Sequence, residues 1–549
     1  MKKNGINYSI EMNRKNFLRL VGVLGAGAIL TPAVLLSSDK SFSYPLRSLL
    51  PLHLRGHRLR KAFNEKDFSE VEISEKEVII VGGGVSGLSS AYFLEKQNIK
   101  DYVLLEMNEH LGGNAAVSQT KGNKFPLGAH YLSLPNPSNI HLIEFLKEQK
   151  LITEETEKGL VYSEEHLVHA PDERLLYRGN FQEGLVPEYG ITKEVKVEIE
   201  HFLEAMKEWK HKKSVSGKDI FSIPLSTSEH SEELLELDQI TFNKWLDDHD
   251  FKSKELRWFL DYCCRDDYGA GSSVVSAWAG IHYFAGRKAK PALSDPTSVM
   301  TWPEGNNFLV KKLAKYSKSK TQNNQLVHQI IEKNDEVLVY TTDCISDKKT
   351  IYKTKKCISA LPSYVNKHIL CSPYWPVELF SGIQHHPWFV AAVSLNKLPE
   401  SEGFPLAWDN VKFGTKGLGY ISNTHQKFIQ HQERFLFSVY LALDSQHPDL
   451  ERKRLFSMTE AEKKQIVLDE LKSLHPSIEE YIDEMIFHSW GHGMVTPYKG
   501  SYQKYRDFLE QKNKAKRVQL AHTDYASYSV FEEAFDQGRM AVEFLTNGN

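Results

Sequence analysis

The pattern of hydrophobic positions predicts buried strands at both ends of the chain and helices in the middle. Residues 77–81 and 102–106 contain short, continuous apolar runs, which are typical of strands covered on both faces of a parallel sheet. Residues 326–332 and 336–340 indicate a hairpin. Across residues 150–290, apolar side chains recur at helical spacing. The clearest stripe is Val195, Ile199, Phe202, Met206 and Trp209. We interpret such stripes as core.

The first 38 residues have the pattern of a targeting segment. Five basic residues surround a single acid, Glu11, and an apolar run follows from Leu20 to Leu36. This run is shorter than the ~20 strongly apolar residues of a spanning helix and is interrupted by glycine and proline. Residues 13–18 resemble a twin-arginine export signal, with Lys15 in place of the second arginine. We expect export to the periplasm or cell envelope of a bacterium, with a membrane association through this segment as the alternative.

Composition narrows the classes of function. A chain of 549 residues is too long for one core, and a formal net charge of -3 disfavours a nucleic-acid partner. The five cysteines form no CxxC pair. The pair His385-His386 has no third ligand at a recognisable spacing, so we expect no metal site.

A glycine-rich turn joins the first predicted strand to a helix and carries the most specific chemistry. Gly82 allows the tight turn, Gly84 lets backbone amides approach a pyrophosphate, and Gly87 permits close packing of helix on strand. Val85 and Ser86 open the helix, whose N-terminus favours negative charge. The next strand ends in Glu106, at the position that binds an adenosine ribose hydroxyl. This βαβ unit predicts a dinucleotide site, but NAD and FAD share it.

Two further segments separate FAD from NAD. Gly112-Gly113-Asn114 follows the acid, and residues 125–131 end in Gly-Ala-His130-Tyr131. Here the chain resembles the flavin amine oxidase superfamily, which includes monoamine and polyamine oxidases, protoporphyrinogen oxidase and phytoene desaturases. The resemblance implies FAD as the cofactor, with Gly112, Gly113 and Asn114 beside it; the usual arginine is replaced by Asn114.

The same resemblance returns near the C-terminus. Residues 520–524 have the pattern of a strand that ends in Asp524, and Ser529 with Glu532 forms a predicted capping box for a helix from about Val530. The resemblance implies that Asp524 holds the ribityl or phosphate part of FAD. It also implies that the helix points its N-terminus at the flavin, and that Val327 lies in the hairpin beside the adenine.

The resemblance implies a Rossmann-like α/β FAD-binding domain of the glutathione-reductase type, built from discontinuous segments, and an α+β substrate domain. The expected boundaries are 1–38 for the export signal, 39–75 for a linker, 76–150, 296–370 and 506–549 for FAD binding, 151–295 for a mainly helical insertion, and 371–505 for the substrate domain.

The expected reaction is transfer of a hydride from a substrate C–H bond to flavin N5, as in amine oxidases. His130, Tyr131 and His492 are the candidate pocket residues, and 265–268 and 408–410 are polar–aromatic clusters of the substrate region. Because no cysteine follows Cys371, FAD is expected to be noncovalent. A small-molecule substrate and O2 or another electron acceptor complete the scheme. Desaturation of an apolar polyene or tetrapyrrole, an NAD(P)-dependent dehydrogenase and a non-catalytic flavin-binding module remain as alternatives.

Overall fold

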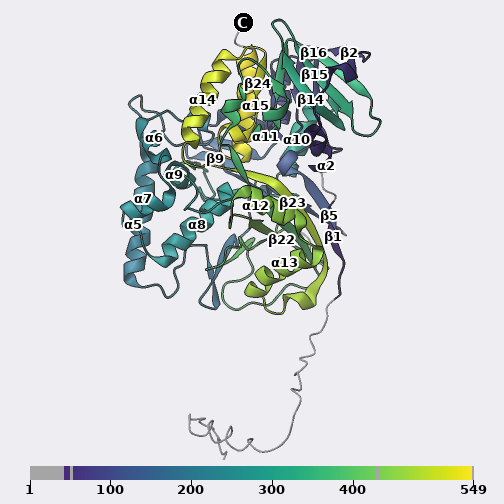
Figure 1. Ribbon diagram of the computed structural model, residues 1–549. Helices are drawn as coiled ribbons and strands as arrows, with labels where there is room; N and C mark the ends of the chain where they lie inside the picture. The colour runs from purple at the N-terminus through teal and green to yellow at the C-terminus, as the bar shows by residue number, and fades with distance from the viewer. Residues whose placement is uncertain (1–42, 50–52, 121, 428–431, 547–549) are drawn as a thin grey trace, which may run out of the picture. The chain divides into compact units, whose positions relative to one another are not determined.

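The βαβ unit that the apolar runs predict is present in the structure, a computed structural model that describes residues 43–49, 53–120, 122–427 and 432–546. Strand β3 (Val78–Val81) leads through the glycine turn into α3 (Val85–Lys96) and on to β4 (Tyr102–Leu105). Every residue of both strands is buried. Alternate residues join hydrophobic clusters on opposite faces, because helices and a second sheet cover the two faces (Figure 1).

These strands belong to a five-stranded parallel sheet assembled from distant parts of the chain. Its order is β13-β4-β3-β17-β24. The added strands are β13 (Thr321–Gln322), β17 (Lys356–Ser359) and β24 (Val518–Leu520). Ala360 N–H donates to the Val81 carbonyl (2.8 Å), and Ala521 N–H donates to the Ser359 carbonyl (2.9 Å). The carboxyl ends of β3, β17 and β24 therefore meet at one edge of the sheet.

A second five-stranded sheet contains the predicted hairpin and confirms it. The order is β18-β14-β15-β16-β2, and β14 pairs antiparallel with β15. The strands are β2 (Ile73–Glu75), β14 (Gln325–Glu332), β15 (Val337–Asp343), β16 (Lys349–Thr354) and β18 (Leu370–Cys371). Val327 lies at a β-bulge of β14 and is buried against the cluster that contains Val81 and Leu105.

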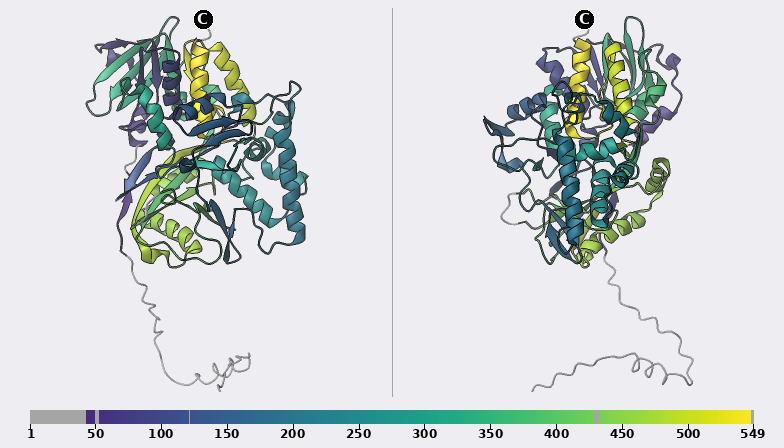
Figure 2. Two further views of the ribbon diagram at one scale, coloured as in Figure 1. Left: turned by 180° about the vertical axis from the view of Figure 1, so that it is seen from behind. Right: turned by 90° about the vertical axis from the view of Figure 1, so that its left-hand side faces the viewer.

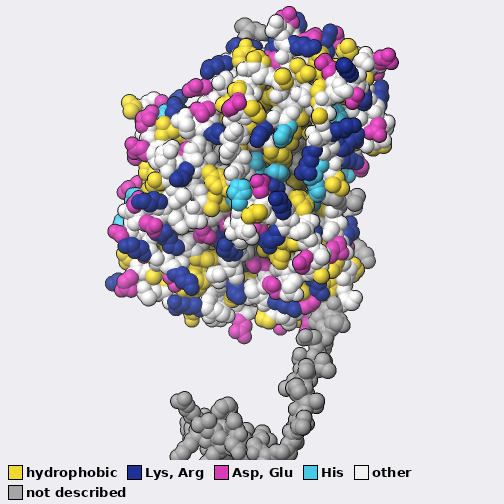
Figure 3. Space-filling view, in the orientation of Figure 1, with side chains coloured by type: hydrophobic (Ala, Val, Ile, Leu, Met, Phe, Trp, Pro, Cys, Tyr) yellow, Lys and Arg dark blue, Asp and Glu magenta, His cyan; other side chains and the backbone are white. Residues whose placement is uncertain are grey.

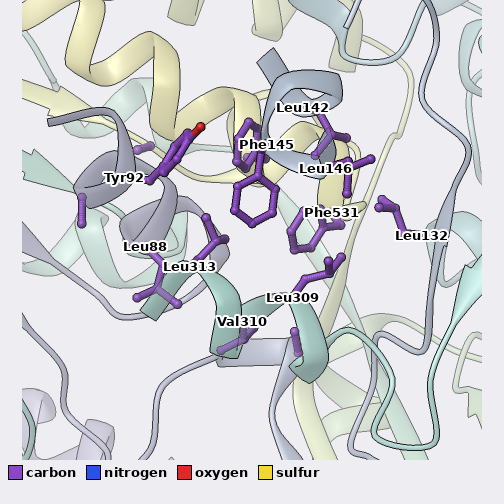
Figure 4. Packing of buried hydrophobic residues seen from close by; sticks show 14 of the residues in the cluster. Leu88, Tyr92, Leu132, Leu142, Phe145, Leu146, Leu309, Val310, Leu313 and Phe531 are labelled. Atoms are coloured by element: carbon purple, nitrogen blue, oxygen red, sulfur yellow. The ribbon is translucent and has the colours of Figure 1, made fainter. Parts of the chain in front are cut away.

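The C-terminal helix α15 (Phe531–Thr546) packs on α3, together with α4 (Ile140–Glu148) and α10 (Asn307–Ser317). Figure 4 shows this core: Tyr92 of α3, Phe145 of α4, Leu313 of α10 and Phe531 of α15 point toward one another. Burial of these large apolar side chains holds the last helix of the chain against the first helix of the nucleotide-type unit.

An eight-stranded sheet forms the second part of the fold (Figures 1 and 2). Its order is β1-β23-β19-β22-β21-β20-β10-β11. The strands are β1 (Leu46–Ser48), β10 (Glu173–Tyr177), β11 (Asn180–Glu183), β19 (Gln384–Leu395), β20 (Asp409–Lys412), β21 (Tyr420–Ser422), β22 (Phe435–Ala442) and β23 (Ile482–Thr496). Helices α12 (Pro448–Ser457) and α13 (Glu460–Leu474) contact this sheet.

Helices between residues 193 and 285 form a layer beside that sheet, as the stripes predict. They are α5 (Lys193–His211), α6 (Glu232–Asp238), α7 (Phe242–Asp248), α8 (Lys254–Tyr268) and α9 (Ala277–Ala285), with α14 (Ser501–Lys514) against α6. Ile199, Phe202 and Met206 are buried, so this stripe is core. The predicted insertion is less helical at its start, where β8 to β11 precede α5. The remaining elements are α2 (His53–Gly56), α11 (Ser363–Ile369), β5 (Val117–Thr120), β6 (Asn123–Pro126), β7 (Tyr131–Ser133), β8 (Ile152–Thr156), β9 (Gly159–Tyr162) and β12 (Val299–Thr301).

The expectation that residues 39–75 are a linker is wrong for the part that the structure describes. Strand β1 pairs with β23, β2 pairs with β16, and Phe68 is 6% exposed. The short strands were missed because three-residue edge strands leave no sustained alternation in the sequence. The predicted export signal, 1–38, lies outside the described residues. Within the described residues, no helix has the length and apolar character needed to cross a bilayer.

The crossing of α15 over α3 depends on Gly538. A Cβ at this position would lie 2.3 Å from the Ser86 carbonyl oxygen and 2.8 Å from the Ser89 Cβ. We expect Gly538→Ala to lower the free energy of unfolding by about 2–3 kcal/mol, because the helices must separate. Urea unfolding followed by circular dichroism measures this.

The control is Gly382→Ala, where a Cβ meets nothing within 4 Å and the cost is only that of a positive φ of 79°, about 1 kcal/mol. Equal losses in the two variants would contradict the close approach of the helices.

Candidate functional site

The glycine turn forms a cradle of backbone atoms at the carboxyl end of β3. Gly82 has a φ of +105° and donates its N–H to the Leu105 carbonyl (2.8 Å). A Cβ on Gly87 would lie 1.9 Å from the Gly82 carbonyl oxygen, so only glycine fits there. Gly84 is the N-cap of α3 and no side chain caps this helix, which begins with Val85 and Ser86. The first amides of α3 thus have the orientation that suits an anion.

The carboxylate of Glu106 is fixed beside this turn. Gly83 N–H donates to Oε2 (2.7 Å) and Asn108 N–H donates to Oε1 (2.8 Å). Burial raises the pKa of Glu106, although these N–H groups oppose the shift. Sequence reasoning missed Gly83. Its Cβ would lie 2.5 Å from a Leu111 methyl and 3.0 Å from Glu106 Oε2, and the run of three glycines was the available signal.

The Gly112-Gly113-Asn114 segment lies directly against the glycine turn. Gly112 N–H donates to the Gly83 carbonyl (2.9 Å). A Cβ on Gly113, whose φ is +55°, would be 3.4 Å from the Gly84 Cα. Asn114 donates from Nδ2 to the Gly493 carbonyl of β23 (2.8 Å) and so joins this segment to the eight-stranded sheet. The surface around Gly84 stays open, because a Cβ there meets only the Gly113 Cα, at 4.0 Å.

Asp524 lies in a 3-10 turn (Thr523–Tyr525) immediately after β24, at the same sheet edge. Both its oxygens already have protein partners. Oδ1 lies 2.9 Å from His385 Nε2 and 3.1 Å from His522 Nδ1, and Oδ2 accepts from the N–H and hydroxyl of Ser363 (2.7 Å each). Burial alone would raise the pKa of this carboxyl, but the two imidazoles outweigh it and hold the pKa well below 3.8. The carboxylate therefore holds His385, His522 and Ser363 together at this edge of the sheet, in addition to any contact with a cofactor.

The three candidate pocket residues fall in two clusters. His130 donates from Nδ1 to the Gly128 carbonyl (3.2 Å) and stacks on Tyr440 at 4.7 Å; burial lowers its pKa to about 4. Tyr131 lies beside His130, with 5.0 Å between ring centroids. His492 instead stacks on Tyr364 at 3.9 Å and lies 5.7 Å from His385, in the cluster of Asp524.

A set of carboxylates that the sequence did not single out lies near Tyr131. Burial, and then the charges of Asp266 and Asp267, raise the pKa of Tyr131. Asp267 is paired, since Arg287 and the Tyr528 hydroxyl both donate to it (2.8 and 2.9 Å). Sequence reasoning noted only polar–aromatic clusters at 265–268 and 408–410, without a reason to connect them.

Glu173 and Asp409 face each other across neighbouring parallel strands, β10 and β20. Tyr262 donates its hydroxyl to Asp409 Oδ2 (3.3 Å), while Oδ1 is buried without a partner, as is the Tyr440 hydroxyl. Burial raises the pKa of Glu173 to about 7, of Asp266 to about 7, and of Asp409 well above its usual range. Glu173 is nevertheless exposed at the surface of the protein.

Comparison with known proteins identifies the family. Residues 85–545 match the model of the flavin containing amine oxidoreductases, which is most of the chain. The chain belongs to this family. It is 33% identical to prenylcysteine oxidase 1 of Rattus norvegicus over 94 residues, 17% of this chain and 18% of the relative. It is 35% identical to carotenoid 3,4-desaturase of Haloarcula japonica over 79 residues, 14% of this chain and 16% of the relative. These matches therefore span less than a fifth of either relative.

A solved structure of putrescine oxidase bound to putrescine has the same fold, with a TM-score of 0.63. Sequence identity to it is 16%, over 86% of this chain and 99% of the other. The family implies a flavin cofactor, and the glycine turn fits FAD. The open surface at Gly84, the uncapped N-terminus of α3 and the anchored carboxylate of Glu106 would hold pyrophosphate and ribose.

Because the surface at Gly84 is open, a substitution there should affect cofactor binding without affecting folding. In Gly84→Ala the added methyl clashes with nothing in the protein, at an ordinary φ of -73°, but occupies the cradle. We expect unchanged thermal unfolding of the apoprotein and FAD affinity reduced by about tenfold or more, equivalent to roughly 1.4 kcal/mol. Titration with FAD, followed by quenching of flavin fluorescence, measures the affinity.

The contrasting variant is Gly87→Ala, which we expect to fail to fold because its Cβ overlaps the Gly82 carbonyl at 1.9 Å. FAD loading of Gly84→Ala equal to that of the wild type would contradict the placement of the phosphates.

Asp524 is expected to stabilise the fold as well as the site. Asp524→Asn leaves two imidazoles and a serine without their buried anion, so we expect a loss of about 3 kcal/mol in the free energy of unfolding at pH 7. Because the folded-state pKa lies below 3.8, the wild-type contribution is present above that pH and disappears as the pH falls through the folded-state pKa. Denaturant unfolding at pH 7 and at a series of pH values below 3.8 measures both effects.

The control is Asp335→Asn. Asp335 is 99% exposed and lies 3.7 Å from Arg517, so its loss should cost about 0–1 kcal/mol. Equal losses of stability in the two variants would show that Asp524 does not stabilise the fold through its buried partners.

Proposed function

We propose that this chain is an FAD-dependent oxidoreductase that oxidises a cationic amine. The bound ammonium must first lose a proton to a neighbouring carboxylate, and FAD, when bound, would then accept the hydride of the substrate C–H bond at N5. The observation that carries the choice of substrate is the group of unpaired acids near Tyr131: Asp409 Oδ1 is buried without a partner, opposite Glu173. Among the described residues, Arg287 is engaged with Asp267 and no cation pairs with Asp409, Glu173 or Asp266.

Unpaired buried carboxylates are costly, and two acids facing each other across strands repel. An ammonium group bound between them would restore the missing pair. Tyr440 and Trp408, which both approach His130 (4.7 and 5.7 Å), supply aromatic faces that also attract cations. An apolar polyene would leave these carboxylates unpaired, and a tetrapyrrole with its own carboxylates would add repulsion. The geometry thus favours the amine over the desaturase alternative.

The chain's own groups have definable tasks in this proposal. His130 is neutral at pH 7, because burial lowers its pKa to about 4, so it adds no charge that would repel an ammonium. Tyr131 and Trp408 lie edge to face at 6.1 Å and would supply aromatic walls beside the substrate. Glu532 begins α15 near Tyr131, and burial raises its pKa to about 7. A protonated Glu532 leaves the positive end of the helix dipole available to negative charge on a reduced flavin.

The proposal also covers how FAD is attached, which electron acceptor reoxidises it and where the protein is located. Noncovalent FAD is supported by the absence of any cysteine after Cys371. O2 or another small acceptor would reoxidise the flavin. Export through the basic and apolar segment 1–38 is supported by its charge pattern, and a folded, cofactor-loaded protein would suit a route that carries folded cargo.

The amine proposal predicts the behaviour of Asp409→Asn. The variant keeps the shape and the acceptor for Tyr262 but cannot take up the negative charge that Asp409 would carry when an ammonium group is bound beside it, so we expect KM for an amine to rise by about tenfold with FAD content unchanged. In the wild type, KM should fall as the pH rises through about 7, because Glu173 and Asp266 must ionise to bind the cation. Anaerobic bleaching of the flavin against amines and matched alcohols measures both.

The control is Asp449→Asn on α12, whose side chain is 64% exposed and which should leave KM unchanged. Bleaching by a polyene or by alcohols, but by no amine, would overturn the proposed substrate. A purified protein that is colourless and binds no FAD would overturn the cofactor.

A further inference from the structure

Residues 53–60 form a short segment, here called the strap, that precedes the family-matched part of the chain. It consists of α2 (His53–Gly56) and a 3-10 turn (His57–Arg60). The family match begins at residue 85, so the strap lies outside the matched region, as do β3 and Gly82–Gly84. The described part of the chain shows what the strap touches.

Arg55 ties the strap to the end of β4. Its Nη1 donates to the Met107 carbonyl (3.1 Å) and to Asn324 Oδ1 (2.9 Å), and its Nη2 pairs with Glu109 (2.9 Å). Met107 and Glu109 immediately follow Glu106, the carboxylate at the ribose position. Arg58 adds a second tie, to Asp347 (2.9 Å). The strap thus crosses the sheet edge where the adenosine half of FAD would lie.

Leu59 and Gly56 show that the strap is packed and not merely tethered. Leu59 packs against the hydrophobic cluster that contains Val81, Leu105 and Val327. A Cβ on Gly56 would contact the Met107 sulfur at 3.8 Å. The strap therefore packs against the same apolar cluster that contains the ends of β3 and β4 and Val327 of the hairpin.

The other end of the strap reaches the eight-stranded sheet. The His53 ring lies 4.4 Å from that of Phe456 on α12. Burial, with smaller contributions from Arg452, His385 and His57, lowers the pKa of His492 on β23. On the face shown in Figure 3, histidine and basic side chains gather around a hollow, in the region where Figure 1 shows α2 and α12. The strap lies between the two sheets, beside the cluster of Asp524.

The charge of the strap is only partly neutralised by protein. Arg55 and Arg58 have acidic partners, whereas Arg60 contacts His57 (3.1 Å) and pairs with no carboxylate among the described residues. The glycine turn and residues 112–114 carry no cationic side chain. A doubly negative pyrophosphate would meet only backbone N–H groups there.

We propose that the strap retains FAD, with Arg55 anchoring it over the adenosine half and Arg60, whose charge no described acid neutralises, adding to the positive potential that attracts the pyrophosphate. This inference rests on the proposed FAD cofactor. The strap acts on the cofactor from outside the family-matched segment, so cofactor retention in this chain depends on residues that the βαβ unit itself does not contain. Opening of the strap would precede FAD release, and its ties would slow that release.

The test compares FAD retention in Arg55→Ala, Arg60→Gln and Lys61→Gln, all in the full-length holoprotein. Lys61 is exposed and adjacent to the strap, so it is the charge-matched control. We expect the dissociation constant for FAD to rise about tenfold in Arg55→Ala, mainly through faster release, and about threefold to fivefold in Arg60→Gln. Lys61→Gln should stay within about twofold. Gel filtration followed by fluorescence of the released FAD measures the constant and the rate.

Two further readouts keep the result decisive. The effect of Arg60→Gln should shrink in high salt, since it is electrostatic. Hydrogen exchange of residues 53–60 should slow on addition of FAD to the apoprotein. If Arg55→Ala does not fold, Arg60→Gln and hydrogen exchange carry the test. A yellow holoprotein in which Arg60→Gln releases FAD no faster than Lys61→Gln, with no FAD-dependent protection of residues 53–60, overturns the strap proposal. A colourless wild-type protein overturns the proposed cofactor instead.

Discussion

The fold and its site depend on the backbone hydrogen bonds that join β3, β17 and β24 side by side. Ala360 N–H to the Val81 carbonyl and Ala521 N–H to the Ser359 carbonyl bring three strand ends together from positions separated by more than 150 residues each. Each loop at this edge then brings one part of the site: the glycine turn, the N-terminus of α11 with Ser363, and Asp524. Because these strands are buried on both faces, their register cannot slip without exposing apolar side chains or burying polar ones.

Asp524 shows how one buried charge can serve both structure and site. Its carboxylate holds Ser363 at the end of β17 and meets His385 of β19, so it links the parallel sheet to the eight-stranded sheet. A charge this deep is tolerated only when its partners satisfy it. That requirement explains why it lies among imidazoles and N–H donors, and it places the cluster of His385 and His492 beside the cofactor edge.

Asp409 and Glu173, unlike Asp524, lack the partners that would compensate a buried charge. Asp409 and Glu173 repel across β10 and β20, and one oxygen of Asp409 is buried with no partner. Sites that conflict with local stability in this way are commonly functional. The strap is a comparable case on the cofactor side, since Arg60 keeps a charge that the described protein leaves without an acid. Both features have a physical explanation once an ammonium group and a pyrophosphate are placed beside them.

The sequence alone determined the local parts of this protein. The apolar runs predicted β3, β4 and the β14–β15 hairpin, and the spacing of Gly82, Gly84 and Gly87 predicted the cradle. These features depend on short-range sterics and periodicity, which a single sequence shows directly. The capping box expected at α15 depends on more than local sequence, because the Ser529 hydroxyl accepts from Val495 N–H (3.2 Å), a partner 34 residues away.

Only the tertiary structure decided which distant residues meet. Nothing in the order of residues showed that Glu173 faces Asp409, that His385 pairs with Asp524, or that β1 and β2 join two different sheets. It also separated His492 from His130 and Tyr131, which the sequence had grouped as one pocket. Such contacts depend on strand pairing and on packing across hundreds of residues, and no local periodicity records them.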